Sequence, residues 1–165
     1  MDSNEINVLV QKLCIRNFLG VFAVDELHQI SKDCEGVFIF NTDPSYKSGQ
    51  HWISVCVSRN HLFYFDPLAS FENVTNEIQT FSKRYDKHLI FNDIRIQSYD
   101  SNKCGAHCLV FCFIMSIKPT SRTYTKYLKS FVSYTVEERE DLCLTYFSKL
   151  TILFFQLYKV FLFLI

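Results

Sequence analysis

A polar, turn-forming run that leads directly into a long apolar segment is the feature that most constrains this chain. Residues 99–103 read Tyr-Asp-Ser-Asn-Lys, and residues 104–115 are largely apolar. The Asp-Ser-Asn residues at 100–102 are types that cap helix N-termini by accepting hydrogen bonds from unpaired backbone N–H groups. The pattern therefore predicts a largely buried helix with Cys104 in its first turn. A helix N-terminus favours thiolate over thiol, which makes Cys104 a candidate nucleophile.

The length and charge of the chain indicate one globular domain. A chain of 165 residues buries most of its apolar surface without needing disulfides or a metal. We expect residues 1–149 to form this domain and residues 150–165 to form an apolar tail. Lys plus Arg equals Asp plus Glu at 17 each. Without a basic excess, charge does not predict strong attraction to nucleic acid.

The cysteines indicate a reducing compartment. The chain has 7 of them, an odd number, and its first residues do not show a basic region followed by an apolar one, as a secretory signal would. We therefore expect reduced thiols, several of them buried as apolar residues, and a cytoplasmic or nuclear protein.

Hydrophobic periodicity predicts a sheet with helices before and after it. Helices are expected at residues 4–14, with Ser3 as a cap, and at 74–85, 104–115, 124–131 and 136–150. Extended segments are expected at residues 18–24, 36–41, 51–57, 61–66, 89–91 and 94–97. The connection at residues 58–60 is short enough for a hairpin. A central sheet of four or five strands flanked by helices is an α+β fold.

The predicted hairpin brings a histidine beside an aspartate. A thiolate nucleophile needs a base, and the base needs a third group to orient it. His51 begins one strand and Asp66 ends the next. Those two ends are adjacent in an antiparallel pair. Asp66 would hold one ring nitrogen of His51 and leave the other to face Cys104.

Two further residues near Cys104 fit the same chemistry. Gln97 lies seven residues earlier, where the predicted strand feeds the polar loop. Its side-chain N–H and the backbone N–H of Cys104 would point at one developing oxyanion. Gly105 is expected to leave the space beside the sulfur open to a substrate backbone.

Three sequence motifs in this order resemble a known pattern. They are His51-Trp52, the Tyr-Phe-Asp-Pro segment at 64–67, and Gln97 separated by six residues from Cys104-Gly105. Together they resemble the His…Asp/Glu…Gln…Cys pattern of the adenain-like and Ulp1-like cysteine proteases. Residues 17–22 and 41–52 look closer to the adenain-like proteases of adenoviruses and of Polinton/Maverick-type DNA transposons. The resemblance covers residues 17–115, most of the chain.

This resemblance implies a role for each residue. His51 would be the general base, Asp66 its partner, Gln97 the oxyanion donor and Cys104 the nucleophile. Trp52 would wall the site beside the base. The implied fold is papain-like, with its parts in a different chain order. Asp66 stands where adenain-like members have Glu and Ulp1-like members have Asp, so the subfamily stays open.

The resemblance also implies an activity, namely a cysteine endopeptidase that cleaves near Gly-Gly-type sites in viral or transposon structural precursors. Two alternatives stay open: a protease that removes a ubiquitin-like modifier, and a catalytically dead protease-fold interaction module. We expect a protein or peptide substrate, a monomer, no cofactor, no metal and no membrane partner. Some relatives use a DNA or peptide activator, which the balanced charge does not support here. A virion location follows if the gene is viral.

Plainer interpretations of the site residues exist. His51 is also an ordinary polar residue at a strand end, Asp66 a turn former before proline, and Gln97 a loop residue. Cys104, Cys108 and Cys112 share one helical face, with His107 nearby, which raises the question of a zinc or iron–sulfur site. Such sites usually combine CxxC-type pairs from separated segments, and none is visible. We therefore expect Cys108 and Cys112 to pack in the core.

The apolar tail at residues 150–165 has three interpretations. It is a membrane anchor, a helix that packs on the domain, or the fortuitous end of a decaying gene. A spanning helix needs about 20 apolar residues, and Gln156 and Lys159 interrupt this run. We favour the latter two together.

Overall fold

A five-stranded mixed sheet forms the centre of the molecule. The computed structural model describes residues 1–70, 72 and 74–163, with side chains as far as Leu153. The strands lie side by side in chain order: β1 (Phe18–Ala23), β2 (Gly36–Asn41), β3 (Trp52–Val57), β4 (His61–Phe65) and β5 (His88–Phe91). The two outer pairs are parallel and the two inner pairs are antiparallel. The predicted α+β fold is therefore confirmed.

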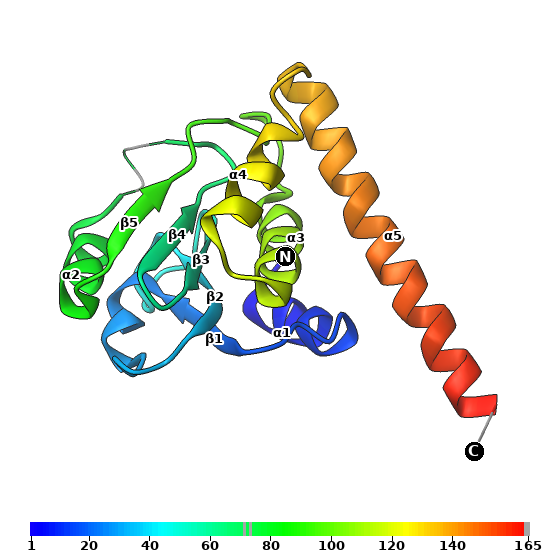
Figure 1. Cartoon of the computed structure of the whole chain (residues 1–165), viewed down its shortest axis with the longest axis horizontal. Coiled ribbons are helices and arrows are strands. Elements are labelled where there is room, and N and C mark those ends of the chain that lie inside the picture. Colours follow the sequence, from blue (N-terminus) through cyan, green and yellow to red (C-terminus); the bar gives the residue numbers. More distant parts are fainter. Residues whose placement is uncertain (71, 73, 164–165) are drawn as a thin grey trace.

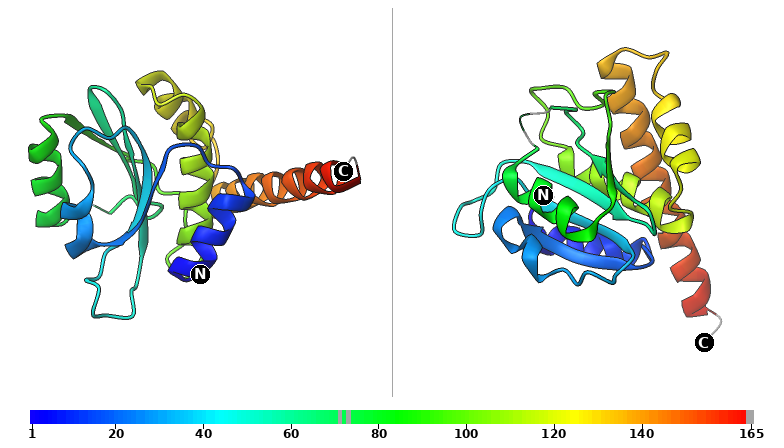
Figure 2. Two further views of the ribbon diagram at one scale, coloured as in Figure 1. Left: turned by 90° about the horizontal axis from the view of Figure 1, so that it is seen from below. Right: turned by 60° about the vertical axis from the view of Figure 1, so that its left-hand side comes forward.

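Helices cover both faces of this sheet (Figures 1 and 2). Their bounds are α1 (Ser3–Lys12), the 3-10 helix η1 (Val24–Gln29), α2 (Asn76–Tyr85), α3 (Cys104–Ile117), α4 (Ser121–Lys129) and α5 (Val136–Phe163). One face carries α1 and α3, and the other carries η1 and α2. Two separate clusters of buried apolar side chains fill the two interfaces.

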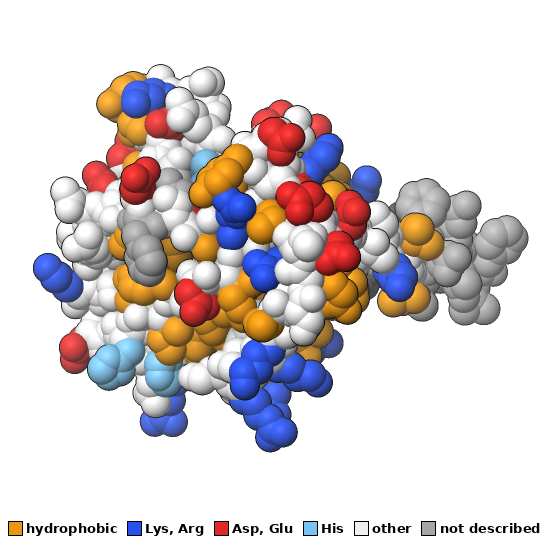
Figure 3. Space-filling view, turned by 90° about the horizontal axis from the view of Figure 1, so that it is seen from above, with side chains coloured by type: hydrophobic (Ala, Val, Ile, Leu, Met, Phe, Trp, Pro, Cys, Tyr) orange, Lys and Arg blue, Asp and Glu red, His pale blue; other side chains and the backbone are white. Residues whose placement is uncertain are grey.

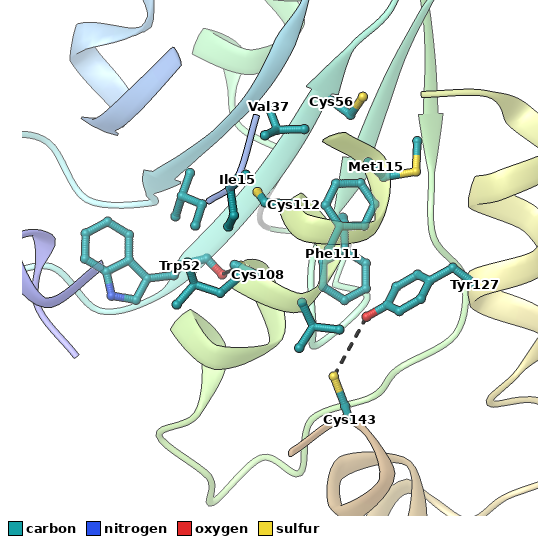
Figure 4. Close-up of a cluster of buried hydrophobic side chains, with 14 of the residues drawn as sticks. Ile15, Val37, Trp52, Cys56, Cys108, Phe111, Cys112, Met115, Tyr127 and Cys143 are labelled. Atoms are coloured by element: carbon teal, nitrogen blue, oxygen red, sulfur yellow. Dashed lines mark hydrogen bonds between the residues drawn. The ribbon is translucent and has the colours of Figure 1, made fainter. Parts of the chain in front are cut away.

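The helix that begins at Cys104 is buried between the sheet and the other helices. It is apolar on all sides, as expected of a helix without a solvent face. Phe111 of α3 stacks on Phe65 at the end of β4, with ring centroids 4.8 Å apart and planes 5° from parallel. Cys108 and Cys112 lie in the same cluster, fully buried (Figure 4). Their predicted place in the core is confirmed, and the Phe65–Phe111 stack fixes α3 against the hairpin.

Two local predictions were wrong. Residues 94–97 form no strand, because Ile96 and Gln97 both donate their backbone N–H to the single carbonyl of Pro67 instead of joining a ladder. The cap of α1 is Asp2 rather than Ser3. Asp2 accepts from the backbone N–H of Glu5, and Glu5 bonds back to Asp2 in a capping box.

The C-terminal part of the chain is a single helix. α5 runs without a break from Val136 to Phe163, so the predicted helix at 136–150 and most of the apolar tail are continuous. Residues 164–165 of the tail lie outside the described residues. Within the described part of the chain, no helix is long and apolar enough to cross a membrane. In Figure 2 the end of α5 extends away from the rest of the molecule.

The surface carries charges of both signs. On the face seen from above, basic side chains are interspersed with acidic and hydrophobic ones rather than forming one broad basic surface (Figure 3). This distribution agrees with the equal numbers of acidic and basic residues in the chain.

Candidate active site

The β3–β4 hairpin brings His51 and Asp66 together as predicted. The pairing register places Ser54 opposite Phe65, so His51 and Asp66 lie just beyond the ladder, at the same end of the hairpin. His51 Nε2 donates to Asp66 Oδ1 over 2.7 Å, and both residues are buried. With Nε2 engaged, the other ring nitrogen is left to face Cys104.

The Asp66 carboxylate is held from several sides. Its Oδ1 also accepts from the backbone N–H of Leu68 at 2.9 Å, and its Oδ2 accepts from that of Ser70 at 3.1 Å. The buried side chain of Asn92 brackets the Asp66 backbone, accepting from its N–H at 2.9 Å and donating to its carbonyl at 2.7 Å. Asn92 follows β5, and its role could not be predicted because no local sequence pattern indicates a contact with Asp66.

Cys104 is the first residue of α3, as predicted, but the helix is capped differently. The N-cap residue is Lys103, and no side chain caps the helix. Ser101 does not cap α3: its hydroxyl donates to Glu140 and accepts from the N–H of Lys103, the residue before the helix, at 3.3 Å rather than from a helical N–H. The prediction of a cap from residues 100–102 was therefore wrong. Because no side chain caps α3, the backbone N–H groups of its first turn remain available to an anion such as a thiolate.

Hydrogen bonds around Cys104 favour a thiolate beside an imidazolium. Burial would raise the pKa of Cys104, but hydrogen bonds from His51 and from the backbone N–H groups of Trp52 and Gly105 outweigh it and lower the pKa. Burial would likewise lower the pKa of His51, but its bonds to Asp66 and Cys104 raise that pKa to about 9. Both shifts favour the thiolate–imidazolium form of the pair over the neutral thiol and imidazole.

Gln97 lies in the same groove as Cys104 and is almost wholly buried. Its Nε2 donates one hydrogen to the carbonyl of Ser101 at 2.7 Å, which leaves the second N–H for another acceptor. Among the described residues its Oε1 has no hydrogen-bond partner. The polar loop thus orients the amide that the sequence analysis assigned to the oxyanion.

A groove of about 780 Å³ passes over these residues. Its lining includes residues 21–23 of β1, the loop that joins β2 to β3, Leu68 and Tyr99. His51, Gln97 and Cys104 also line the groove.

Trp52 and Gly105 both contact Met1. Trp52 lines the groove beside His51, as expected, and its indole N–H donates to the carbonyl of Met1 at 2.9 Å. Gly105 does not line the groove. A Cβ placed on Gly105 would lie 2.8 Å from Sδ of Met1, so the space beside this glycine is filled by a side chain of the chain itself. The expectation that Gly105 opens this space to substrate was therefore wrong in this structure.

The described residues contain no group of three or more His, Cys, Asp or Glu side chains that could hold a metal. His107 is fully buried on α3, and burial lowers its pKa to about 4, so it is neutral at pH 7. Its Nε2 lies 3.6 Å from Oε1 of Glu140, a residue of α5.

Comparison with known proteins gives one informative relative. No family model matches the chain. The protein named Protease of Snake adenovirus serotype 1 is 26% identical over 144 residues, covering 78% of this chain and 72% of the relative. The resemblance to adenain-like proteases is confirmed. Of the four residues that carried the resemblance, His51, Gln97 and Cys104 line one groove, and the buried Asp66 is hydrogen-bonded to His51 behind it.

A solved structure also matches in part. The 1.7 Å structure of ChlaDub1 from Chlamydia trachomatis aligns with a TM-score of 0.43 at 23% identity. The match covers 63% of this chain and spans about half (49%) of the length of ChlaDub1. At that TM-score the likeness adds nothing to the assignment.

Proposed function

We propose that this chain is a cysteine endopeptidase with Cys104 as nucleophile, His51 as general base and acid, Asp66 as its orienting partner, and Gln97 as oxyanion donor. The observation that carries the proposal is the chain of hydrogen bonds from Asp66 through His51 to the sulfur at the uncapped start of α3. Similarity to an adenovirus protease supports the same reaction class.

The reaction proceeds by acyl transfer. The Cys104 thiolate attacks the scissile carbonyl carbon, and the carbonyl oxygen becomes an oxyanion that accepts from the Gln97 side chain and the Cys104 N–H. The imidazolium of His51 gives its proton to the leaving amine, and the C–N bond breaks. Neutral His51 then takes a proton from water, which attacks the thioester and releases the acid and the thiolate.

For the substrate we propose Gly-Gly-type sites in structural precursor proteins of a virus or transposon. The support is the adenovirus origin of the relative together with the family resemblance. Residues 1–149 are proposed as the protease domain. This boundary is supported by Phe147 and Leu150 of α5, which are partly buried against the core.

The test is thiol labelling and peptide cleavage by the full chain. A cysteine-directed activity probe and a Gly-Gly peptide library are used with wild type, Cys104→Ser and Cys14→Ala. Cys14 is the matched control because it is the exposed free thiol. We expect Cys104→Ser to lose all cleavage and Cys14→Ala to keep it.

Two outcomes would contradict the proposal in different ways. Cleavage that survives Cys104→Ser would remove Cys104 from the reaction. Absence of cleavage in wild type, with a folded protein, would instead favour the interaction module. Fusions to ubiquitin-like modifiers are run beside the peptides, and preferential cleavage of those fusions would reassign the substrate.

A further inference from the structure

The segment that carries Gln97 is held in place by α5 rather than by the sheet. Residues 95–101 form no strand, and the first turns of α5 lie beside them (Figure 1). Arg139 of α5 donates from Nη1 to the carbonyl of Arg95 at 3.0 Å and from Nε to that of Phe131 at 2.8 Å. One side chain thus ties the start of the segment to the beginning of α5.

The next residue of α5, Glu140, holds the other end of the segment. Its Oε2 accepts from the backbone N–H of Ser98 at 3.1 Å, and its Oε1 accepts from the hydroxyl of Ser101. Glu140 is 9% exposed, although glutamate is rarely buried unless it is paired. Burial would raise the pKa of Glu140, but the bonds from Ser101 and Ser98 outweigh it and keep the pKa low. The carboxylate is therefore a permanent double acceptor at neutral pH.

Ser101 connects Glu140 to the amide of Gln97. Its hydroxyl donates to Glu140, while its carbonyl accepts from Gln97 Nε2 at 2.7 Å. A movement of the 98–101 turn therefore moves the atom that orients the Gln97 side chain. Hydrogen-bond donors to an oxyanion lose most of their effect when they are displaced by a fraction of a bond length.

Glu140 also contacts the helix that carries the nucleophile. Its Oε1 lies 3.6 Å from Nε2 of His107, which is one turn along α3 from Cys104. The same carboxylate therefore touches both the turn before Cys104 and the helix after it. The Glu140 carboxylate is therefore positioned relative to the helix that carries the Cys104 sulfur as well as relative to the turn that orients the Gln97 amide.

We propose that Glu140 is a positioning residue that holds the 98–101 turn, and through Ser101 the Gln97 amide, in register with Cys104. The inference rests on the proposed peptidase function. Glu140 lies on α5 and would influence the reaction without touching the substrate. Glu140 acts on the oxyanion only through the loop, so its loss is expected to lower kcat more than it changes KM.

The experiment compares Glu140→Ala, Glu140→Gln and the control Glu137→Ala in peptide cleavage. Glu137 is an exposed glutamate one turn earlier on α5. We expect Glu140→Ala to lower kcat about 10-fold with KM changed by less than about 2-fold, a fraction of the roughly 10²-fold effect of an oxyanion donor. Glu140→Gln is expected to restore most of kcat, because its amide accepts from Ser98 and donates to Ser101. Glu137→Ala is expected to equal wild type.

Alkylation of Cys104 by iodoacetamide separates positioning from general damage. This rate reports the Cys104–His51 ion pair and does not use the oxyanion, so it should be equal in wild type and Glu140→Ala. Combining Glu140→Ala with Gln97→Ala should cost no more than Gln97→Ala alone, as expected for two residues that act as a unit. If the double variant lost kcat by the product of the two single losses, or if Cys104 were alkylated more slowly in Glu140→Ala than in wild type, the inference would be overturned. Failure of wild type to cleave would overturn the proposed function instead.

Discussion

The two halves of the candidate site are held by different kinds of structure. His51 and Asp66 lie at one end of the β3–β4 hairpin, where backbone pairing on both strands sets their separation. Gln97 and Cys104 lie at the two ends of a loop without ladder hydrogen bonds, and side chains from α5 hold that loop. The hairpin half is fixed by local register, and the loop half by contacts with a helix far along the chain.

This difference suggests what each half contributes. A histidine–aspartate pair needs a constant separation between its two side chains. The register of paired strands fixes that separation. An oxyanion donor has to meet an atom that exists only during reaction, so small shifts of its support change the rate and not the fold. We therefore expect changes in the hairpin half to have the larger effects on activity, and changes in the loop half to act through positioning.

The largest expected effect is that of Asp66→Asn in the hairpin half. The amide keeps the shape but removes the charge that stabilises the His51 imidazolium and favours its correct tautomer. We expect kcat/KM to fall roughly 10³- to 10⁴-fold, the upper figure being the effect of the equivalent change in a serine-protease triad. Steady-state cleavage of a Gly-Gly peptide measures it.

Asp93→Asn serves as the matched control, since Asp93 is exposed and lies in the loop after β5. Wild-type activity is expected for this variant. If Asp66→Asn retained more than about a tenth of wild-type kcat/KM, the carboxylate would be structural, and the hairpin half would lose its assigned role.

The sequence predicted the hairpin half better than the loop half. Alternating or continuous apolar runs with a short connection determine strand pairing locally, so the ends that carry His51 and Asp66 followed from the pattern. The strand predicted at 94–97 was wrong, because apolar residues alternate there without a neighbouring strand edge to accept them. The predicted cap at 100–102 was wrong because the polar side chains of that turn have a distant partner.

The supporting residues could not be predicted for the same physical reason. Asn92 and Glu140 act on Asp66 and on the 98–101 turn, and Glu140 lies about forty positions from the residues it binds. Nothing in a local pattern distinguishes Glu140 from its exposed neighbours on α5. Gly105 was misread because its packing partner, Met1, comes from the start of the chain.

A smaller effect is expected for His107→Phe in α3, the helix that begins where the loop half ends. His107 is buried and neutral, with a pKa lowered from 6.5 to about 4, mainly by burial and against the attraction of Glu140. At a pH between the unfolded-state pKa of 6.5 and the folded-state pKa of about 4, His107 binds a proton in the unfolded chain but not in the folded chain. Stability is thus fully present above pH 6.5 and falls as the pH drops, by about 2 kcal/mol at pH 5.

Phenylalanine fills a similar space and cannot titrate, so His107→Phe should remove most of this acid sensitivity. Urea unfolding at pH 7 and pH 5 measures it for both proteins. An equal loss of stability in wild type and variant would show that His107 is not the group responsible.

The interaction between His51 and the Cys104 thiol joins the two halves, and the pH dependence of Cys104 alkylation tests it most directly. The measurement is made in a Cys14→Ala background, so that the exposed thiol does not contribute. Because the pKa of Cys104 is lowered and that of His51 is raised to about 9, alkylation should remain fast well below the ordinary thiol pKa and change again near pH 9. His51→Ala should move the main inflection to that of an ordinary or buried thiol. The same profile in both proteins would contradict the account.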